Sequence, residues 1–460
     1  METLAGQVIS REHSTATAIG GAHPMRWCDL IAQARTIARS VNSRDLVVIE
    51  GDIDTGTYVT ITACVLADTP FVMRHPRLDT LQILNHVMEN LEPTVSISVN
   101  SSGISVSRVH DREWRFGKRL PQLRYIGLTS GSSGPPRAVL LPVNGHDAFL
   151  RRGVESLYLT EEAVFGDPAN ASDLSLTNFF LSLFAGSIWI PFLQVFERVR
   201  AFQSLARYKV THWRSVSTWV SMFQKSAGQI AINPTMQIVG FGGEILTSRT
   251  VADSRVLFPK AKILNTYGST ESNGFVSVED VTADNKSGIC KFCSIGVELD
   301  GWQFSTKDAY GSLELVITSP HIAHGYIDSP LSAKSVGVIK HLNGRLQTRD
   351  AVELQPDGKY VVVGRLDRRF NHRGVLISPE PIEKRIGSIL GIDCCLIPTA
   401  RDLVLLIEDS AGRSIEHDRF VLEALPSYLV PMRISRVDKL PRLPSLKIDY
   451  RAALELTFGE

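Results

Sequence analysis

The sequence predicts an α/β protein with a large N-terminal domain of layered α/β subdomains, a small β-barrel-like part, and a small α+β C-terminal domain. The chain has 460 residues, which is too long for one ordinary hydrophobic core. Short apolar runs alternate with helix-length amphipathic segments through most of it, and this alternation is typical of helices layered on largely parallel sheets. Beyond residue 310 the apolar runs are separated by turn sequences, which favours short antiparallel strands.

The first part of the chain supplies the expected parallel strands. Apolar runs predict strands at 45–50, 70–73, 95–99, 188–192, 237–241 and 262–265. A helix is expected at 56–67, between the first two strands. No repeat of fixed period is visible.

The last part of the chain changes character. Antiparallel strands are expected at 311–318, 344–348 and 360–364, with turns at Asn343-Gly344 and Asp357-Gly358. The basic stretch RLDRRFNHRG follows and contains no Gly/Ser linker. We therefore place a domain boundary at Asp367, with a tight hinge between domains 1–367 and 368–460. The second domain is expected to contain a helix at 381–390 and a strand at 403–408.

Composition excludes several classes of protein. Hydrophobic residues make up 43% and charged residues 21%, as in a soluble globular enzyme. The formal net charge is +1 and no block of one sign stands out, so neither nucleic acid nor an anionic membrane is an expected partner. Six cysteines are too few for a disulfide framework. Cys290 and Cys293 have C-x-x-C spacing without two further zinc ligands, and Cys394 and Cys395 are adjacent in an apolar run, so reduced thiols are expected.

One uncharged segment, 174–193, is long enough to cross a bilayer. It is interrupted by Thr177, Asn178, Gly186 and Pro191, which favours a buried helix at 174–185 followed by a buried strand at 187–192. The polar segment 1–24 lacks the apolar core of a signal peptide. We therefore expect a cytoplasmic protein.

A Ser/Gly-rich loop is the first candidate for phosphate binding. Residues 129–137 read TSGSSGPPR and follow an apolar run at 125–128. Glycines let the backbone approach phosphate oxygens closely, hydroxyls and free N–H groups donate to them, and Arg137 adds a charged fork. By composition alone an ordinary surface loop explains the pattern as well, and the GK[ST] ending of a Walker loop is missing.

Four further motifs follow this loop in order. They are NTYGSTE at 265–271, TRD at 348–350, GRLD at 364–367 with Arg373-Gly374 behind it, and LPRLPSLKID at 440–449. Together with TSGSSGPPRAV, these motifs resemble in order and spacing the signatures of the ANL superfamily, which comprises acyl-CoA synthetases, adenylation domains of nonribosomal peptide synthesis, and luciferases. The segment 27–96 also resembles the N-terminal region of that family. The resemblance implies ATP-dependent activation of a carboxylic acid as its acyl-AMP, with a mobile C-terminal domain.

The resemblance also implies which residues bind the nucleotide. Tyr267 would stack on adenine, Asn265 would bond its amino edge, and Asp350, backed by Arg365, would accept the ribose hydroxyls. The remaining implied ATP and AMP contacts are Thr129, Ser130, Gly131, Ser132, Ser133, Gly134, Gly242, Gly243, Glu244, Thr266 and Gly268.

The same resemblance implies the catalytic groups. Lys447, with Thr270 and Arg137, would stabilise the negative charge that develops between the substrate carboxylate and the phosphates. Glu271 would hold Mg²⁺, a hard cation that prefers carboxylate and phosphate oxygens. Asp367 would be the hinge about which the small domain rotates, excluding water from the acyl-AMP.

The acid pocket, carried over by position, comprises Asp173, Leu174, Thr177, Arg214, Val239, Phe241, Thr266, Gly274 and Phe275. In amino-acid-activating members of the family an aspartate pairs with the α-ammonium group, and Asp173 with Gly186 has the corresponding spacing. A helix N-cap explains Asp173 equally simply. Arg214 resembles the cation of aspartate- or asparagine-activating domains and could clamp a side-chain carboxylate. It could also bond internal carbonyls or point to solvent.

The sequence departs from the family at several positions: Arg137 stands for lysine, Ala138, Arg349 and Leu446 for glycine, and Asn371 for lysine. The ATP site tolerates these changes, whereas they put recognition of the acceptor in doubt. Little chain follows Lys447, so we expect a stand-alone enzyme that activates an amino acid, with aspartate or a relative preferred, and loads the phosphopantetheine thiol of a separate carrier protein. A CoA ligase for a small organic acid and a degenerate ATP-binding homologue are the alternatives.

Overall fold

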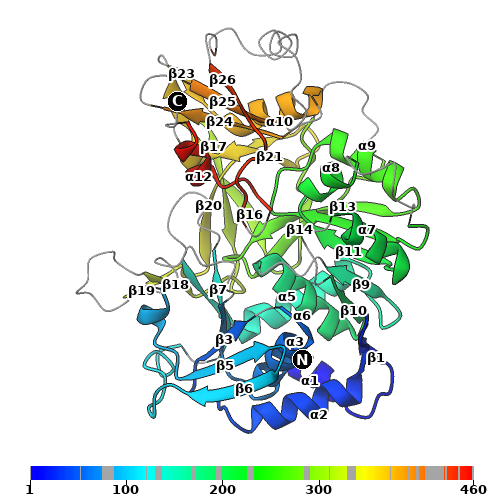
Figure 1. The fold of residues 1–460 in the computed structure, drawn as a ribbon. Coiled ribbons are helices and arrows are strands. Elements are labelled where there is room, and N and C mark those ends of the chain that lie inside the picture. The colour runs from blue at the N-terminus through cyan, green and yellow to red at the C-terminus, as the bar shows by residue number, and fades with distance from the viewer. Residues whose placement is uncertain are drawn as a thin grey trace.

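The computed structural model describes residues 2–457 apart from 52, 75–86, 121, 130–136, 168–171, 193–197, 225–232, 284–290, 310, 329–337, 373–374, 391–392, 400–402, 410–428, 430–432 and 444–445. Two large sheets with helices between and around them form most of the molecule, and a smaller group of elements from the C-terminal part of the chain lies at one end (Figure 1).

An eight-stranded sheet has the order β19-β18-β8-β7-β4-β3-β5-β6. Its four central strands run parallel, while its edge strands are antiparallel. The strands are β3 (Val47–Gly51), β4 (Phe71–Arg74), β5 (Val95–Asn100), β6 (Gly103–Arg108), β7 (Leu123–Leu128), β8 (Ala138–Pro142), β18 (Gly325–Asp328) and β19 (Val338–His341).

A nine-stranded sheet has the order β15-β14-β13-β12-β11-β9-β10-β1-β2. The strands from β13 to β1 run parallel, and both edges are antiparallel. The strands are β1 (Thr17–Ile19), β2 (Met25–Arg26), β9 (Val164–Asp167), β10 (Ile188–Pro191), β11 (His212–Ser215), β12 (Ile238–Gly242), β13 (Lys262–Ser269), β14 (Gly274–Asp280) and β15 (Val297–Glu298). All six strands expected from the first part of the sequence are therefore confirmed. Parallel pairs predominate in the nine-stranded sheet, whereas most pairs of the eight-stranded sheet are antiparallel.

The helices that accompany the sheets are α1 (Leu4–Ile9), α2 (Trp27–Ala38), α3 (Thr55–Leu66), α5 (Val143–Ser156), α6 (Asp173–Ala185), α7 (Arg198–Arg207), α8 (Thr218–Gln224) and α9 (Ser248–Leu257). The largest apolar core joins side chains from both sheets with those of α2, α3, α5 and α6. A helix with a layer on either side must be apolar all round, and this explains the uncharged segment that begins at Leu174. α6 starts at the Ser172 N-cap and ends at Gly186, whose φ of 78° closes the helix in the left-handed region.

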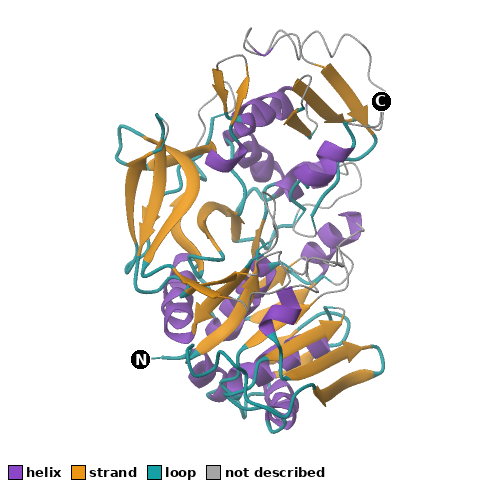
Figure 2. Cartoon of the chain, turned by 90° about the vertical axis from the view of Figure 1, so that its left-hand side faces the viewer, coloured by secondary structure: helices purple, strands orange, loops and turns teal. Residues whose placement is uncertain are grey.

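The expected β-barrel-like part is an open sheet. Its strands are β16 (Gln303–Asp308), β17 (Leu313–Thr318), β20 (Arg345–Leu354) and β21 (Tyr360–Arg365), in the order β16-β17-β20-β21 (Figure 2). Among the described residues the two edge strands do not pair with each other, and β21 instead forms a bridge from Val361 to Ser294. Asp357-Gly358 turns β20 into β21 as expected. Asn343-Gly344 does not close a hairpin, because it connects β19 of the eight-stranded sheet to β20 of this one.

The C-terminal elements begin at the 3-10 turn η3 (Leu366–Arg368). They continue with β22 (Phe370–His372), β23 (Val375–Ile377), α10 (Pro379–Leu390), β24 (Cys394–Pro398), β25 (Leu403–Glu408), β26 (Arg433–Val437) and α12 (Tyr450–Glu455). Cys394 and Cys395 are both buried and face opposite sides of β24, in two different apolar clusters. The Arg368 guanidinium pairs with Glu383 and Glu380 on α10 and lies over the Tyr450 ring, so η3 is held to the C-terminal elements. The boundary at Asp367 stays a prediction.

In the described part of the chain no helix combines the length and apolar character that crossing a bilayer requires. The five described cysteines are free thiols, and Cys290 of the C-x-x-C pair lies outside the described residues.

Candidate functional site

Three of the expected site residues, Arg214, Gly242 and Tyr267, lie at or near the carboxyl ends of β11, β12 and β13 in the nine-stranded sheet. These strands end at Ser215, Gly242 and Ser269 and run parallel, so their carboxyl ends meet at one edge. Ligands of open α/β sheets bind beyond this edge.

Thr129 and Arg137, the first and last residues of the Ser/Gly-rich loop, are joined by two hydrogen bonds at its base. The Thr129 N–H donates to the Arg137 carbonyl (3.1 Å), and the Arg137 N–H donates to the Thr129 hydroxyl (3.0 Å). Ser130, Gly131, Ser132, Ser133 and Gly134 lie outside the described residues, as do Arg373 and Gly374 of the hinge motif.

The loop base is connected to the carboxylate expected to hold Mg²⁺. The Arg137 guanidinium lies 5.4 Å from the ring centre of Tyr326, and the Tyr326 hydroxyl donates to Glu271 Oε1 (3.2 Å). Glu271 Oε2 makes no hydrogen bond within the described residues. No group of three metal-ligating side chains occurs there either. One carboxylate with phosphate oxygens and water is, however, a normal donor set for Mg²⁺.

A chain of hydrogen bonds joins the expected ribose site to the expected hinge. The Tyr267 hydroxyl donates to Asp350 Oδ2 (2.6 Å), and Arg365 Nη1 donates to Asp350 Oδ1 (3.1 Å). The same guanidinium makes two further bonds to Asp367, at 3.1 and 2.9 Å. Burial raises the pKa of Asp350, and Arg365 opposes this shift. Arg365 thus stabilises the charged form of Asp350, and its hydrogen bonds also link Asp350 to Asp367.

Hydrogen bonds orient two of the residues expected around adenine, the buried Asn265 and the half-buried Glu244. Asn265 Nδ2 donates to the Ser294 carbonyl (2.7 Å), which leaves its Oδ1 available as an acceptor. Glu244 accepts from the Ser217 hydroxyl (2.6 Å) and from the backbone N–H of Thr218 (3.0 Å). Burial raises the pKa of Glu244, but Lys384, these donors and Lys447 outweigh it and hold the pKa below its usual value.

Lys447 reaches this edge of the large sheet from the C-terminal elements. Its Nζ would lie 3.3 Å from a Cβ added to Gly243, whose φ is 77°. Burial lowers the pKa of Lys447, and Glu244, Asp350 and Glu271 act in the opposite direction. Just before it in the chain, the Leu446 N–H donates to the Leu443 carbonyl (2.8 Å).

Two of the expected departures from glycine keep a glycine-like backbone. Leu446 has a φ of 67° and Arg349 a φ of 64°, both in the left-handed region. The Leu446 side chain is half-buried and packs on an apolar cluster of the nine-stranded sheet. The Arg349 N–H donates to Glu314 (3.1 Å).

Asp173 is the first residue of α6 rather than its N-cap, since Ser172 accepts the capping bond from the Ser175 N–H. The Asp173 carboxylate therefore serves no capping role. Its Oδ1 accepts from the Tyr125 hydroxyl (2.9 Å). Burial raises the pKa of Asp173, while hydrogen bonds from Thr270 and Tyr125 lower it. Gly127 makes room for this cluster, because a Cβ there would lie 2.5 Å from the Thr270 methyl group.

Arg214 is buried, with 6% of its surface exposed, and lies at the end of β11. Its Nε donates to the Thr266 hydroxyl (3.1 Å), its Nη1 donates to Asn178 Oδ1 (3.0 Å), and the guanidinium lies 4.7 Å from the ring centre of Phe275. Nη2 makes no hydrogen bond to a described residue and lies near Gly242, where an added Cβ would be 3.2 Å away. Burial lowers the pKa of Arg214 to about 10, and Asp167 and Asp173 oppose this shift.

On β12 the residues that face Arg214 are Gly240 and Gly242, each one position away from the expected pocket residues Val239 and Phe241. Side chains alternate between the faces of a strand. An added Cβ at Gly240 or Gly242 would contact Arg214, whereas Val239 and Phe241 face the opposite side and are buried in a core with Trp213. Val239 and Phe241 therefore do not line a pocket with Arg214.

Three other expected pocket residues, Leu174, Thr177 and Gly274, contact neighbouring parts of the site. Leu174 lies beside Gly243. Thr177 donates its hydroxyl to the Asp173 carbonyl (2.7 Å) and so presents its methyl group. Gly274 permits close packing, since a Cβ there would lie 2.6 Å from the Phe149 ring. Gly268, expected to contact the nucleotide, does the same, since a Cβ there would lie 2.1 Å from the Gly274 carbonyl.

Three contributors escaped the sequence reasoning. Tyr125 lies in an apolar strand, Asn178 is a polar residue inside an apolar helix, and Ser217 precedes α8. Only Asn178 has a sequence signal, because a polar side chain in a helix that is otherwise apolar needs internal partners.

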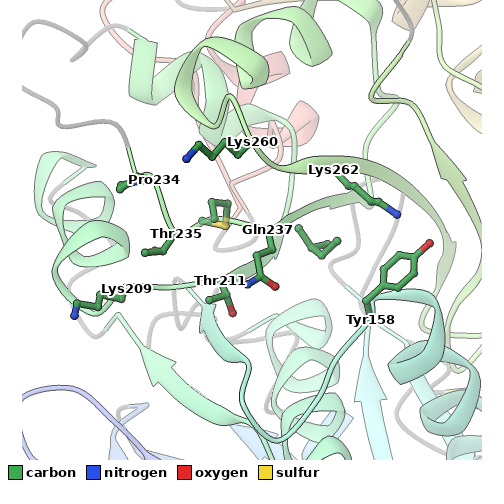
Figure 3. A pocket seen from close by; sticks show the side chains of 10 residues that line it. Tyr158, Lys209, Thr211, Pro234, Thr235, Gln237, Lys260 and Lys262 are labelled. Atoms are coloured by element: carbon green, nitrogen blue, oxygen red, sulfur yellow. The ribbon is translucent and has the colours of Figure 1, made fainter.

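A cavity of about 700 Å³ lies at the opposite, amino edge of the same strands (Figure 3). It is lined near the starts of β11, β12 and β13, among others by Thr211, Ile238 and Lys262. Its three lysine side chains extend in different directions. It contains none of the expected site residues.

Comparisons with known proteins agree with this geometry. A family model described as AMP-binding enzyme matches residues 37–327. The D-alanine--D-alanyl carrier protein ligase of Bacillus mycoides (strain KBAB4) is 27% identical over 355 residues, which cover 72% of this chain and 70% of that protein.

Two solved structures share the fold. A four-domain nonribosomal peptide synthetase, holo-AB3403 bound to AMP and glycine, has a TM-score of 0.78 at 20% identity, over 98% of this chain and 36% of that chain. The o-succinylbenzoate CoA synthetase of Bacillus subtilis, in complex with its acyl-adenylate intermediate, has a TM-score of 0.76 at 16% identity, over 98% of each chain.

Proposed function

The chain belongs to the family of AMP-binding enzymes and is an adenylate-forming ligase, and we propose that the acid it activates is an amino acid with an anionic side chain, aspartate being the best candidate. The observation that carries the proposal is the pair of opposite charges in the acid pocket. Arg214 is buried there and Asp173 is half-buried. Each opposes the shift of the other's pKa, but the described contacts include no hydrogen bond or ion pair between them. A zwitterion with a second carboxylate would satisfy both.

The proposed chemistry is attack of the substrate carboxylate on the α-phosphorus of ATP. A bond forms between one carboxylate oxygen and the phosphorus, and the bond to pyrophosphate breaks. Lys447 would stabilise the negative charge that accumulates there, together with Thr270 and Arg137. Asp350 and Tyr267 would hold the ribose and adenine, and Glu271 would hold Mg²⁺, which neutralises phosphate charge. Gly242 and Gly243 keep side chains out of the space beside Arg214 and Lys447, and the groups named above have the chemistry that a nucleotide requires, so the residues fit ATP.

Arg214 also separates the proposal from the substrate of the named relative. D-alanine carries no side-chain anion that could pair with the Arg214 guanidinium, whose charge is otherwise opposed by Asp167 and Asp173. A buried cation is stabilised by an anion that bonds it directly. This favours aspartate or a near relative over alanine in the present pocket.

For the second half-reaction we propose transfer to the phosphopantetheine thiol of a separate carrier protein. The support is the carrier protein ligase among the relatives. CoA is the alternative acceptor, since a CoA synthetase shares the fold. A cytoplasmic location stays a prediction.

Amino-acid-dependent ATP–pyrophosphate exchange tests the proposal. The panel should contain aspartate, asparagine, glutamate, D-alanine, L-alanine, and several aryl and fatty acids. Exchange with aspartate that is lost in Asp173→Ala would support it, with Ser172→Ala as the control that removes the capping bond to the Ser175 N–H and keeps the Asp173 carboxylate. Exchange with alanine alone would contradict the role of Arg214, and exchange with non-amino acids alone would contradict the role of Asp173. CoA-dependent release of AMP would favour the CoA ligase, and ATP binding without exchange would favour a degenerate homologue.

A further inference from the structure

Asn178 lies in the middle of α6, is completely buried, and connects three groups around the acid pocket. Its Nδ2 donates to Asp167 Oδ1 (2.8 Å) and to the Arg214 carbonyl (2.8 Å). Its Oδ1 accepts from Arg214 Nη1 (3.0 Å). Asn178 therefore contacts Arg214 at both its backbone and the tip of its side chain.

Only a carboxamide of this length matches these three partners. The site offers two acceptors and one donor, and an amide group has two N–H donors and one carbonyl acceptor. A carboxylate at position 178 would face two acceptors, and an aliphatic side chain would leave Asp167 Oδ1, the Arg214 carbonyl and one guanidinium N–H without this partner. The partners also determine which way the amide points.

The result is a guanidinium held on three sides. Asn178 bonds Nη1, Thr266 bonds Nε, and Phe275 covers one face. Gly240 leaves space for the stem, since an added Cβ would lie 3.2 Å from the Arg214 Cγ. The Nη2 edge then remains beside Gly242, toward the carboxyl edge of the sheet. A long flexible side chain loses binding energy unless it is ordered beforehand.

We propose that Asn178 is the positioning residue that orients Arg214 and thereby makes the pocket select an amino acid with an anionic side chain. The inference rests on the proposed function and deepens it. Asn178 acts through Arg214, since its side-chain hydrogen bonds go to Asp167 and Arg214 and to none of the residues expected to bind the ammonium group or the nucleotide. Its removal should therefore reduce discrimination between an anionic side chain and its neutral isostere, and leave the use of ATP unchanged.

The test is the ratio of kcat/KM for aspartate to that for asparagine in ATP–pyrophosphate exchange, measured for the full chain. Asn178→Leu removes all three hydrogen bonds at similar volume. We expect the ratio to fall about 10- to 100-fold, as for loss of a hydrogen bond to a charged group, with the KM for ATP within about 2-fold of wild type. Ser175→Ala is the matched control, because the Ser175 hydroxyl bonds Asp167 but not Arg214. It should leave the ratio unchanged.

A double-mutant cycle separates positioning from general damage to α6. In an Arg214→Met background, Asn178→Leu should change the ratio by less than about 2-fold, because no guanidinium is left to orient. An equal fall in both backgrounds would overturn the inference. If Asn178→Leu does not fold, Asn178→Ser takes its place in the cycle, with the same two outcomes.

Failure of the proposed function would look different. If the wild-type enzyme shows no preference for aspartate over asparagine, the anionic substrate itself is wrong and the inference falls with it. If the wild type prefers aspartate and Asn178→Leu retains that preference, only the role of Asn178 is refuted.

Discussion

Replacing Arg214 by methionine removes the one buried cation of the acid pocket and keeps an unbranched side chain of similar length. The wild-type guanidinium has two internal hydrogen bonds and leaves Nη2 beside Gly242. If Nη2 binds the side-chain carboxylate of the substrate, the variant forces that carboxylate into a buried site without a partner. Breaking a buried charge pair in this way costs about 3–5 kcal/mol. Exchange with aspartate should therefore lose about 10²- to 10³-fold or more in kcat/KM.

The stability of the variant should move little. Burial lowers the pKa of Arg214 to about 10. The folded state holds the proton less tightly than the unfolded state, so at neutral pH the buried charge destabilises the fold by about 3 kcal/mol. Arg214→Met relieves this cost, but it also loses the packing and hydrogen bonds that the side chain makes with Thr266, Asn178 and Phe275, so the two changes act in opposite directions.

The assay combines ATP–pyrophosphate exchange with unfolding in urea. We expect Arg214→Met to lose aspartate exchange while its free energy of unfolding stays within about 1 kcal/mol of wild type. Arg214→Lys is the control that keeps a charge without the planar fork, and it should retain partial activity. Aspartate exchange within about 3-fold of wild type in Arg214→Met would refute the assignment of this side chain to the substrate carboxylate.

Four further predictions follow from the described contacts. Lys447→Met should lower kcat for exchange about 10²- to 10³-fold with little change in the KM for ATP, since the charge acts on the transition state; a large rise in KM alone would contradict this. Burial raises the pKa of Asp350, and the proposed ribose contact requires its charged form, so the KM for ATP should rise as pH falls through that raised pKa. Arg365→Gln removes the charge that opposes the shift and should move this rise in KM to higher pH. Leu446→Gly should be more stable than Leu446→Ala by about 1 kcal/mol in urea, because only glycine relieves the left-handed backbone; equal stabilities would show that the strain is absent. Burial raises the pKa of Glu380 to about 7, although the nearby Arg368 charge opposes this shift. The free energy of unfolding of the wild type should therefore increase as pH falls from about 7 toward 5, and Glu380→Gln should abolish that increase.

The fold followed from the sequence because its signals are local and repeated. Each buried strand of a parallel sheet must be a short apolar run, and each helix between two layers must be apolar over several turns. The same reasoning placed a helix and a strand in the uncharged segment after Asp173, where a membrane span was the alternative. Motif order then predicted that Lys447, Tyr267 and Asp350 belong to one site, and they do lie together.

Other features depended on partners far away in the sequence. The small antiparallel sheet is open rather than barrel-like because β21 pairs beyond its edge with Ser294, and Asn343-Gly344 joins two different sheets because β19 pairs with β18. Pairing of this kind leaves no local mark, since a turn sequence specifies how the chain bends and not which sheet receives the next strand.

The sequence by itself therefore determined the order of elements and the adenylate-forming family, and it predicted the set of groups expected around ATP. Only the tertiary structure decided which face of β12 meets Arg214 and which side chains hold that guanidinium. Moving one residue along a strand reverses the face, so Gly240 and Gly242, rather than Val239 and Phe241, lie against it. The role of Asn178 arises in the same way, because a buried amide acquires its meaning from the donors and acceptors that folding brings around it.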